Sequence, residues 1–394
     1  MITTVNPPPS DRASGATSVA TGSVVAFEHV TKRYGNGPTA VTDLSLEIRA
    51  GEVCVLVGPS GCGKTTTMKM VNRLVEPTSG RVTIDGADVA SLHPVELRRR
   101  IGYVIQHVGL FPHLTVAENV AVVPRLLGWR EPRITERVEE LLDLVGLEPG
   151  AYRSRYPAAL SGGERQRVGV ARAMAADPSV LLMDEPFGAV DPIRRERLQN
   201  EFLRLQARLR KTIVFVTHDV DEAIKMADRI AILQIGGVLA QYDTPDRLLA
   251  APASPFVEHF VGADRGLKRL SLARVRDLPL EPVVTVAARE SISAARQRVP
   301  DGTRWVLVTD ARRRPLGWVA TNDLKGGGVV DPDMAVPGST LLQPESTLRD
   351  ALSAMLASSV QLGVVVDEDD AVLGVISVAA ISATLRDVVG TPPS

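Results

Sequence analysis

The sequence predicts an α/β fold in residues 24–262 and a smaller α+β module in residues 281–388. Three observations predict this arrangement. An apolar run, Val53–Val57, is followed by a glycine-rich loop and then by a helical run. Two later apolar runs end in ionisable residues, at Asp184 and at His218. The last third of the chain contains two similar segments, which indicates a repeated structural unit.

The composition limits the classes of protein that the chain can be. It has 394 residues, 44% of them hydrophobic and 23% charged, which is ordinary for a globular protein of two or more domains. A formal net charge of −1 does not favour a general nucleic-acid binder. No apolar run approaches the roughly 18 residues of a membrane helix. Work at a membrane would therefore require a partner.

Residues 1–23 are rich in Ser, Thr, Ala and Pro and lack the apolar core of a secretory signal. We expect them to form a disordered tail. The two cysteines, Cys54 and Cys62, make no disulfide framework and indicate a reducing cytosol. Cys62 lies inside the glycine-rich loop, where it is either a reactive thiol or an incidental small side chain, and we favour the second interpretation.

The glycine-rich loop fits the phosphate-binding pattern G-x-x-x-x-G-K-[ST]. Its glycines let backbone N–H groups surround an anion, and the following helix adds positive potential at its N-terminus. A chance glycine-rich turn is the alternative, and the flanking strand and helix argue against it. We expect a nucleoside triphosphate site, in which Lys64 contacts the β- and γ-phosphates and Thr65 offers a hydroxyl to Mg²⁺. The loop consists of Gly58, Pro59, Ser60, Gly61, Cys62, Gly63, Lys64 and Thr65, and Thr66 opens the helix.

Before this loop, the pattern predicts strands at Val24–Val30 and Leu44–Ile48, with Tyr34 exposed in a turn between them. After it, residues 81–105 read as strand, turn, short helix and strand. Gln106 ends that run, at the expected carboxyl edge of a sheet. Residues 112–176 form a separate helical lobe.

Within that lobe, Ser161 and Glu164 have the spacing of a capping box at a helix N-terminus. A well-capped helix is the simplest interpretation. Gly162 and Gly163 leave bare N–H groups in the first turn, however, and such a helix start is also an anion site. A second phosphate cradle in one chain requires an explanation.

The apolar strand Val180–Met183 ends in two carboxylates, Asp184 and Glu185. Paired acids at a buried strand end are costly unless a cation neutralises them. Asp184 is placed to hold Mg²⁺, and Glu185 to act as the general base toward an attacking water. A solvated acid pair is the alternative. The strand Thr212–Thr217 then ends in His218, which we expect on the same sheet edge.

Together these motifs resemble the ATP-binding subunits of ABC transporters over about residues 25–262. The resemblance implies a RecA-like P-loop core with an antiparallel β-subdomain and a helical subdomain. The signature LSGGQ of that family reads Leu160–Glu164 here, with Glu in the last place, and Gly188 stands where the family usually has Ser. In that family two subunits meet head to tail, which explains the second cradle.

The resemblance also implies roles for particular residues. Tyr34 would stack on adenine, Gln106 would contact Mg²⁺ and the membrane subunit, and His218 would sense the γ-phosphate. Asp191 ends the loop Gly188–Asp191 of the nucleotide site. Ser161, Gly162, Gly163 and Glu164 would complete the site of a second copy. The implied catalytic set is Glu185, His218, Gln106 and Lys64, with Thr65, Gln106 and Asp184 on the metal and with ATP and Mg²⁺ as cofactors.

The runs Lys69–Leu74 and Glu96–Gln106 are similar to those of importers for glycine betaine, choline, carnitine and proline betaine. After a linker at 263–280, the C-terminal part resembles a tandem CBS module at about 281–328 and 336–388. Gly317 and Gly374 are 57 residues apart (374 − 317). The usual ribose contacts of such modules are a Ser or Thr and an Asp three residues later. Each repeat keeps only one of the two: Asp323 with Ala320, and Ser377 with Ala380.

The turns of the two repeats carry opposite charges, at residues 312–314 and 367–370. They are either two solvated hairpin turns or a sensor of ionic strength, and we favour the first interpretation.

These observations lead to one predicted function and two alternatives. The chain is expected to be the ATP-hydrolysing subunit of an importer for quaternary-amine osmoprotectants, regulated by the CBS module. Its expected partners are a second copy, a multi-span permease and an extracytoplasmic substrate-binding protein, at the cytoplasmic face of the membrane. An importer ATPase for an amino acid or polyamine, and a soluble ABC-type switch without a transport partner, are the alternatives.

Overall fold

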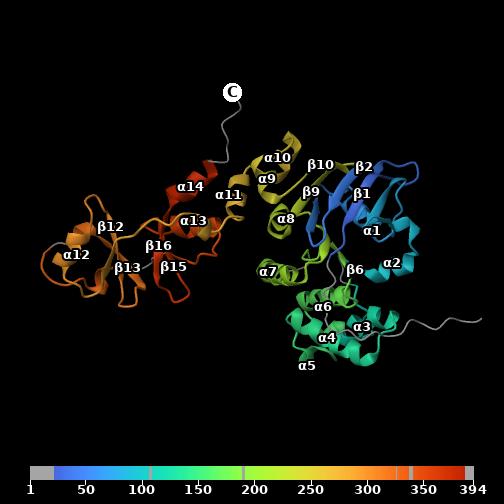
Figure 1. The fold of residues 1–394 in the computed structure, drawn as a ribbon, viewed down its shortest axis with the longest axis horizontal. Helices are drawn as coiled ribbons and strands as arrows, with labels where there is room; N and C mark the ends of the chain where they lie inside the picture. The colour runs from blue at the N-terminus through green and yellow to red at the C-terminus, as the bar shows by residue number, and fades with distance from the viewer. Residues whose placement is uncertain (1–21, 106–108, 189–190, 325, 337–339, 387–394) are drawn as a thin grey trace, which may run out of the picture. The chain divides into compact units, whose positions relative to one another are not determined.

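The computed structural model describes residues 22–105, 109–188, 191–324, 326–336 and 340–386 (Figure 1). The chain divides into two compact units. Unit 1 is residues 1–54 with 63–216, and unit 2 is residues 55–62 with 217–394. The proposed tail at 1–23 lies outside the described residues except for Gly22 and Ser23.

A four-stranded antiparallel sheet begins unit 1, in the order β2-β1-β4-β5. The alternation of buried and exposed residues along β1 and β2 is the pattern of strands with one face on a core. The strands are β1 (Val25–Arg33), β2 (Thr39–Ile48), β4 (Ser79–Ile84) and β5 (Ala87–Asp88).

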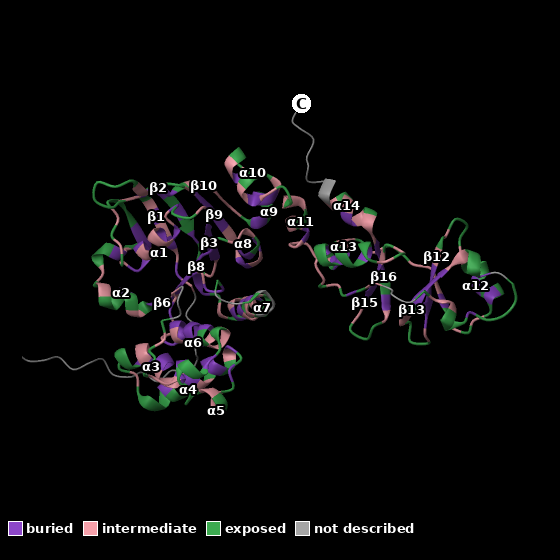
Figure 2. Cartoon of the chain, turned by 180° about the vertical axis from the view of Figure 1, so that it is seen from behind, coloured by how far each residue is buried: buried purple, intermediate pink, exposed green. Residues whose placement is uncertain are grey.

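The central sheet has six strands in the order β10-β9-β3-β8-β7-β6. Strands β6, β7 and β8 are parallel neighbours in unit 1, with Asp184 of β7 opposite Val216 of β8. Strands β3, β7 and β8 are buried along their whole length, which explains why they read as continuous apolar runs (β3 and β8 are labelled in Figure 2). Their bounds are β3 (Val53–Val57), β6 (Ile101–Val104), β7 (Val180–Asp184) and β8 (Thr212–Val216).

The helices of unit 1 include a lobe that gathers at one end of the unit, around α3, α4, α5 and α6 (Figure 1). This agrees with the helical lobe expected at 112–176. Both α3 and α6 begin with complete capping boxes, built by Thr115 with Glu118 and by Ser161 with Glu164. The helices are α1 (Lys64–Val71), α2 (Pro94–Arg100), α3 (Val116–Leu126), α4 (Glu131–Leu144), α5 (Pro149–Tyr152), α6 (Gly162–Met174) and α7 (Pro192–Leu209).

Unit 2 contains the antiparallel pair β9–β10, several helices and two small three-stranded sheets. Its first elements are α8 (Val220–Met226), β9 (Arg229–Gln234), β10 (Val238–Asp243), α9 (Pro245–Ala250), α10 (Pro255–Val261) and α11 (Arg265–Leu270).

The two small sheets have the same topology, β11-β12-β13 and β14-β15-β16. In each, a parallel pair is followed by an antiparallel pair that pairs a valine with the repeated glycine, Val308 with Gly317 and Val365 with Gly374. The register shift falls at the same place in both. The elements are β11 (Thr285–Ala287), α12 (Ile292–Arg298), β12 (Trp305–Thr309), β13 (Pro315–Ala320), β14 (Thr340–Leu342), α13 (Leu348–Leu356), β15 (Leu362–Val366), β16 (Val372–Ser377) and α14 (Val378–Arg386).

The segment expected as a linker, 263–280, contains ordered structure instead. It includes α11, and the side chains of Leu270 and Val275 are buried in one cluster with Leu348 and Met355 of α13. Apolar side chains in this segment join the core of the second repeat, which a reading of composition alone did not reveal.

The basic turn at 312–314 contacts the first residue of β16, the strand that follows the acidic turn. The backbone N–H of Val372 donates to the carbonyl of Arg313, with an N···O distance of 3.1 Å. An Arg313 guanidinium nitrogen donates in turn to the carbonyl of Val372, at 3.3 Å. Arg313 of the first repeat is therefore bonded to β16 of the second repeat through backbone carbonyl groups.

Candidate active site

The loop Gly58–Thr65 requires glycine at two positions for steric reasons. A Cβ on Gly58 would lie 2.2 Å from the carbonyl oxygen of Leu233, and one on Gly63 would lie 2.2 Å from that of Ala40. Both glycines have positive φ, 152° and 95°. A glycine-rich loop that leads into a helix N-terminus is the arrangement that binds an anion in phosphate-binding loops.

Lys64 and Thr65 are the first two residues of α1. The side chain of Lys64 is nearly buried, with 8% of the residue exposed. The Thr65 hydroxyl donates to Asp184, and the Oγ1···Oδ1 distance is 3.3 Å. Because α1 and β7 are far apart in the chain, the fold itself has brought these two predicted metal ligands together.

Burial raises the pKa of the Asp184 carboxyl, and the charge of Glu185 raises it further. The hydrogen bond from Thr65 and the charges of Lys69 and Lys64 act in the opposite direction. The negative charge of Asp184 is therefore incompletely compensated, and only 8% of the residue is exposed to solvent. A bound cation would supply the missing compensation.

The residues present fit Mg²⁺ carried by a nucleotide. In the described part of the chain, no group of three or more His, Cys, Asp or Glu side chains could hold a metal ion by itself. Mg²⁺ usually takes only one or two protein oxygens and fills its other positions with phosphate oxygens and water. Thr65 and Asp184 supply two such oxygens. Gln106, the third expected ligand, lies outside the described residues.

Glu185 follows β7 directly and has a left-handed backbone, with φ of 45°. Its N–H donates to the carbonyl of Val216 at 2.9 Å, and its carbonyl accepts from the N–H of Gly188 at 3.1 Å. A non-glycine residue in this conformation carries strain, which is frequent at functional sites. These bonds fix a half-buried carboxylate beside Asp184. Asp191 is exposed, and residues 189–190 of its loop lie outside the described part.

His218 lies two residues beyond Val216, the residue opposite Asp184 in the β7–β8 ladder. Thr217 donates its N–H to the carbonyl of Leu56 at 3.3 Å. On the other side, Asp219 caps α8 by accepting from the N–H groups of Asp221 and Glu222. The exposed His218 is therefore held between a strand end and a helix N-cap.

The capping box of α6 uses Glu164 fully. The N–H of Ser161 donates to Oε2 of Glu164 at 2.6 Å, and the hydroxyl of Tyr152 donates to Oε1 at 2.7 Å. These bonds lower the pKa of Glu164 to about 2. Ser161 and Gly162 remain exposed, and the space around a Cβ on Gly162 is open. The N-terminus of α6 is thus rigid and accessible to a ligand.

Tyr34 follows β1 and is 50% exposed. Its hydroxyl oxygen lies 3.5 Å from Oγ1 of Thr66, in the first turn of α1. An exposed ring next to the phosphate loop can stack on a base, as aromatic side chains do in nucleic-acid recognition.

Sequence reasoning did not identify Tyr103 and Lys69 as neighbours of the site. Burial raises the pKa of Tyr103 to about 12, and the charge of Asp184 contributes to that shift. Tyr103 lies on β6 beside β7, so finding it required the strand order. Lys69 could have been found from spacing, because it lies four residues after Thr65 on a helix and shares its face.

In the C-terminal repeats, the hydroxyl of Ser377 donates to Glu281 at 2.8 Å and accepts from the N–H of Ala380 at 3.2 Å. It therefore serves as an internal contact and helix cap. The incomplete ribose motif of this repeat is consistent with that use.

Comparison with known proteins agrees with this geometry. A family model described as ABC transporter matches residues 41–188, and one described as CBS domain matches residues 335–387. The osmoprotectant import ATP-binding protein OsmV of Salmonella typhimurium is 46% identical over 90% of this chain and 94% of its own length. The glycine betaine/carnitine/choline transport ATP-binding protein OpuCA of Bacillus subtilis is 45% identical over 92% of this chain and 97% of its own.

Among solved structures, the dimeric ATP-binding cassette MJ0796 in a post-hydrolysis state, bound to ADP and Pi, is 34% identical. The match covers 56% of this chain and 98% of that one, with a TM-score of 0.50. In the described part of the chain, no helix has the length and apolar character required to cross a membrane.

Proposed function

The chain belongs to the ATP-binding subunits of ABC transporters, of the type that imports osmoprotectants, and on that premise we propose how its residues carry out the work. The proposal is that it powers uptake of quaternary-amine osmoprotectants such as glycine betaine, choline and carnitine. The observation that carries it is the similarity to OsmV and OpuCA over nine tenths of the chain, which includes the C-terminal module. An importer ATPase for another solute would share the cassette alone.

In the proposed site, backbone N–H groups of Gly58–Gly63 and the ammonium of Lys64 hold the phosphates of ATP. Thr65, Asp184 and Gln106 hold Mg²⁺, which supplies charge neutralisation on the phosphate oxygens. Glu185 accepts a proton from the attacking water, and His218 contacts the γ-phosphate. Two observations support these assignments: the hydrogen bond from Thr65 to Asp184, and the backbone hydrogen bonds that hold Glu185.

We propose a head-to-tail homodimer as the active form. The exposed N-terminus of α6, with Ser161, Gly162 and Gly163, would close on the γ-phosphate bound to a second copy. Its open surface supports this role. The dimeric MJ0796 cassette offers the precedent for such pairing. Each chain has one phosphate loop and one signature, so a symmetric dimer contains two sites.

The remaining partners are a multi-span permease and an extracytoplasmic substrate-binding protein, with this chain at the cytoplasmic face of the membrane. The names of the relatives, which describe import and transport, support that assembly.

The C-terminal repeats, which we assign to two CBS domains at about 281–328 and 336–388, are proposed to regulate hydrolysis. The contacts of Lys268 on α11 support a route for this. Its Nζ donates to the carbonyl of Val261 at 2.8 Å and lies 3.1 Å from Asp264 and 3.6 Å from Asp221. Asp221 belongs to the helix capped just after His218, while Leu270 on the same α11 packs in the core of the second repeat.

Transport by the assembled importer tests the proposal. The chain is expressed together with a permease and a substrate-binding protein of an osmoprotectant importer, in cells without their own osmoprotectant importers. Uptake of labelled glycine betaine or choline should require Lys64 and Glu185. The assignment would be contradicted if the purified chain carried no membrane protein with it, or if the cells took up only an unrelated amino acid.

A further inference from the structure

Tyr34 has little in its own loop to orient its ring. It follows the last residue of β1 and precedes Gly35, which has a φ of 51°. Its carbonyl accepts from the N–H of Gly37 at 3.0 Å, which fixes the turn but not the side chain. Lys32 is two residues earlier, near the end of β1. The Nζ of Lys32 lies 5.0 Å from the centroid of the Tyr34 ring.

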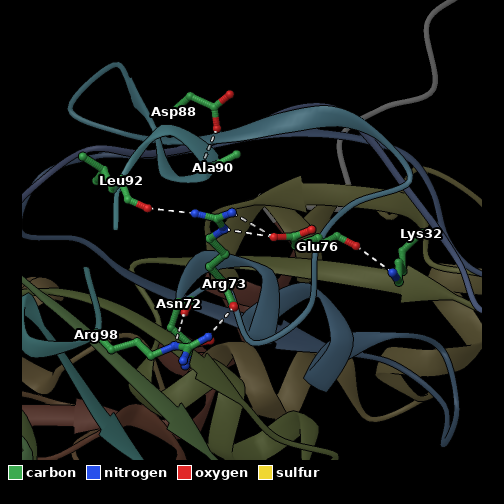
Figure 3. A network of polar contacts seen from close by, with 8 residues as sticks. All are labelled: Lys32, Asn72, Arg73, Glu76, Asp88, Ala90, Leu92 and Arg98. Atoms are coloured by element: carbon green, nitrogen blue, oxygen red, sulfur yellow. Dashed lines mark hydrogen bonds and ion pairs between the residues drawn. The ribbon is translucent and has the colours of Figure 1, made fainter. Parts of the chain in front are cut away.

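The ammonium of Lys32 is itself anchored. It donates to the carbonyl of Glu76, with an N···O distance of 2.7 Å (Figure 3). The side chain of Glu76 is held by Arg73, whose Nε and one terminal nitrogen donate to Oε1 at 3.1 and 3.0 Å. The other terminal nitrogen of Arg73 donates to the carbonyl of Leu92 at 2.8 Å.

A second arginine completes the network at the C-terminal end of α1. Arg98 on α2 donates from Nε to the carbonyl of Asn72 at 3.1 Å and from a terminal nitrogen to that of Arg73 at 2.6 Å (Figure 3). Cations at this end of a helix also interact favourably with its dipole. The segment that contains Glu76, the anchor of Lys32, therefore directly follows α1, the helix that begins at the end of the phosphate loop.

The Tyr34 ring is thus related to both ends of α1. Its hydroxyl lies near Thr66 in the first turn, and the cation above its ring is bonded to the segment after the last turn. With half of the residue exposed, a surface remains for a base.

We infer that Lys32 is a positioning residue for the adenine base, which acts by holding the Tyr34 ring in the orientation that stacks on the nucleotide. The inference rests on the proposed role of Tyr34 in ATP binding. A cation within about 6 Å of an aromatic centroid attracts the ring. A ring that is already oriented loses less conformational freedom when the base binds. The hydrogen bonds of Arg73, Glu76 and Arg98 fix the position of the Lys32 ammonium relative to α1, the helix that follows the phosphate loop.

Binding to the full-length chain, measured by calorimetry without Mg²⁺, tests the inference with two probes. ATP carries the base, whereas inorganic tripolyphosphate carries only the phosphates. K32M keeps the length of the side chain without its charge, and K32R restores a cation.

We expect K32M to weaken ATP binding about two- to five-fold, the range that an exposed cation–π contact gives. Tripolyphosphate binding should be unchanged, and K32R should recover most of the ATP affinity.

Two further variants separate this inference from the proposed function. In a Y34A background, K32M should have no additional effect on ATP binding. R81Q, which breaks the Arg81–Glu28 pair on the same sheet, is the matched control and should bind both probes normally. Equal losses for ATP and tripolyphosphate in K32M, or an undiminished loss in the Y34A background, would overturn the role of Lys32. If Y34A alone bound ATP normally while K64A did not, the stacking role of Tyr34 would fail as well.

Discussion

The hydroxyl of Thr65, in the first turn of α1, donates a hydrogen bond to the carboxylate of Asp184 at the end of β7. The Oγ1···Oδ1 distance is 3.3 Å. This bond joins α1, the helix that follows the glycine-rich loop, to β7, the strand that ends at Asp184 and is followed by the proposed base Glu185. It also partly compensates a buried charge that burial and Glu185 disfavour. The pair is therefore arranged for a cation, and its energetics should change when one is bound.

The first prediction concerns D184N in the nucleotide-free chain. Burial raises the native pKa of Asp184, so its contribution to stability is complete below the ordinary value of 3.8 and is lost as pH rises through the native value. We expect D184N to have a higher Tm than the wild type at pH 7, and the difference to vanish in acid. Thermal unfolding over this pH range measures it.

With Mg²⁺ and ATP present, the order of the two melting temperatures should reverse, because D184N lacks a proposed Mg²⁺ ligand and gains less stability from binding than the wild type. D143N, an exposed substitution on α4, should behave like the wild type in both conditions. A D184N variant that gained as much as the wild type from Mg²⁺ and ATP would exclude Asp184 as a ligand.

The second prediction concerns E185Q. Glutamine preserves the size of the side chain but cannot accept a proton, so hydrolysis should fall by roughly 10²- to 10⁴-fold, the usual contribution of a general base. ATP binding should persist, and the variant should accumulate as an ATP-bound dimer on size-exclusion chromatography. Turnover at the wild-type rate would refute the assignment of the base.

The third prediction compares two capping boxes in the same lobe. Glu164 caps α6 at the proposed signature, and Glu118 caps α3 with the same geometry. E164A and E118A should each lower stability, because each removes the glutamate at N3 of a capping box. Only E164A should also reduce ATP hydrolysis, since only α6 would face a second nucleotide. Equal activity losses in the two variants would indicate a general effect on the lobe.

The pH dependence of E164Q provides a separate check. Hydrogen bonds lower the native pKa of Glu164 from its ordinary value of 4.5 to about 2. Its contribution to stability is therefore present above pH 4.5 and is lost as the pH falls toward 2. The difference in Tm between the wild type and E164Q should shrink across that interval, whereas a pH-independent difference would contradict it.

Much of the fold could be predicted because its signals are local. The continuous apolar runs at β3, β7 and β8 reflect burial on both faces, and the box at Ser161 and Glu164 depends on a spacing of three residues. The repeated strands were found because Gly317 and Gly374 recur at equal positions in two sheets of one topology.

Other features could not be predicted because they depend on tertiary contacts. Tyr103 affects Asp184 only through the adjacency of β6 and β7. The segment 263–280 was expected to be a linker, and only the packing of Leu270 against α13 shows that it joins the core of the second repeat. Lys32 could not be identified from the sequence, because the carbonyl group that anchors its ammonium belongs to Glu76, 44 residues away.

The last prediction concerns Lys268, whose side chain is 12% exposed and joins α11 to the first turn of α8. Substitution by Met keeps its apolar stem and removes the ion pairs with Asp264 and Asp221. Partly exposed pairs contribute up to about 1 kcal/mol, so local opening of α8 should rise by roughly five-fold or less. Hydrogen exchange of the α8 amides measures this opening, and the KM for ATP should rise with it. The control is R265M. Arg265 is also on α11, and this substitution removes its ion pair with Glu258 on α10, so α8 should remain unchanged. If both variants loosened α8 alike, Lys268 would have no specific role in transmitting a signal from the C-terminal repeats to the segment that bears His218.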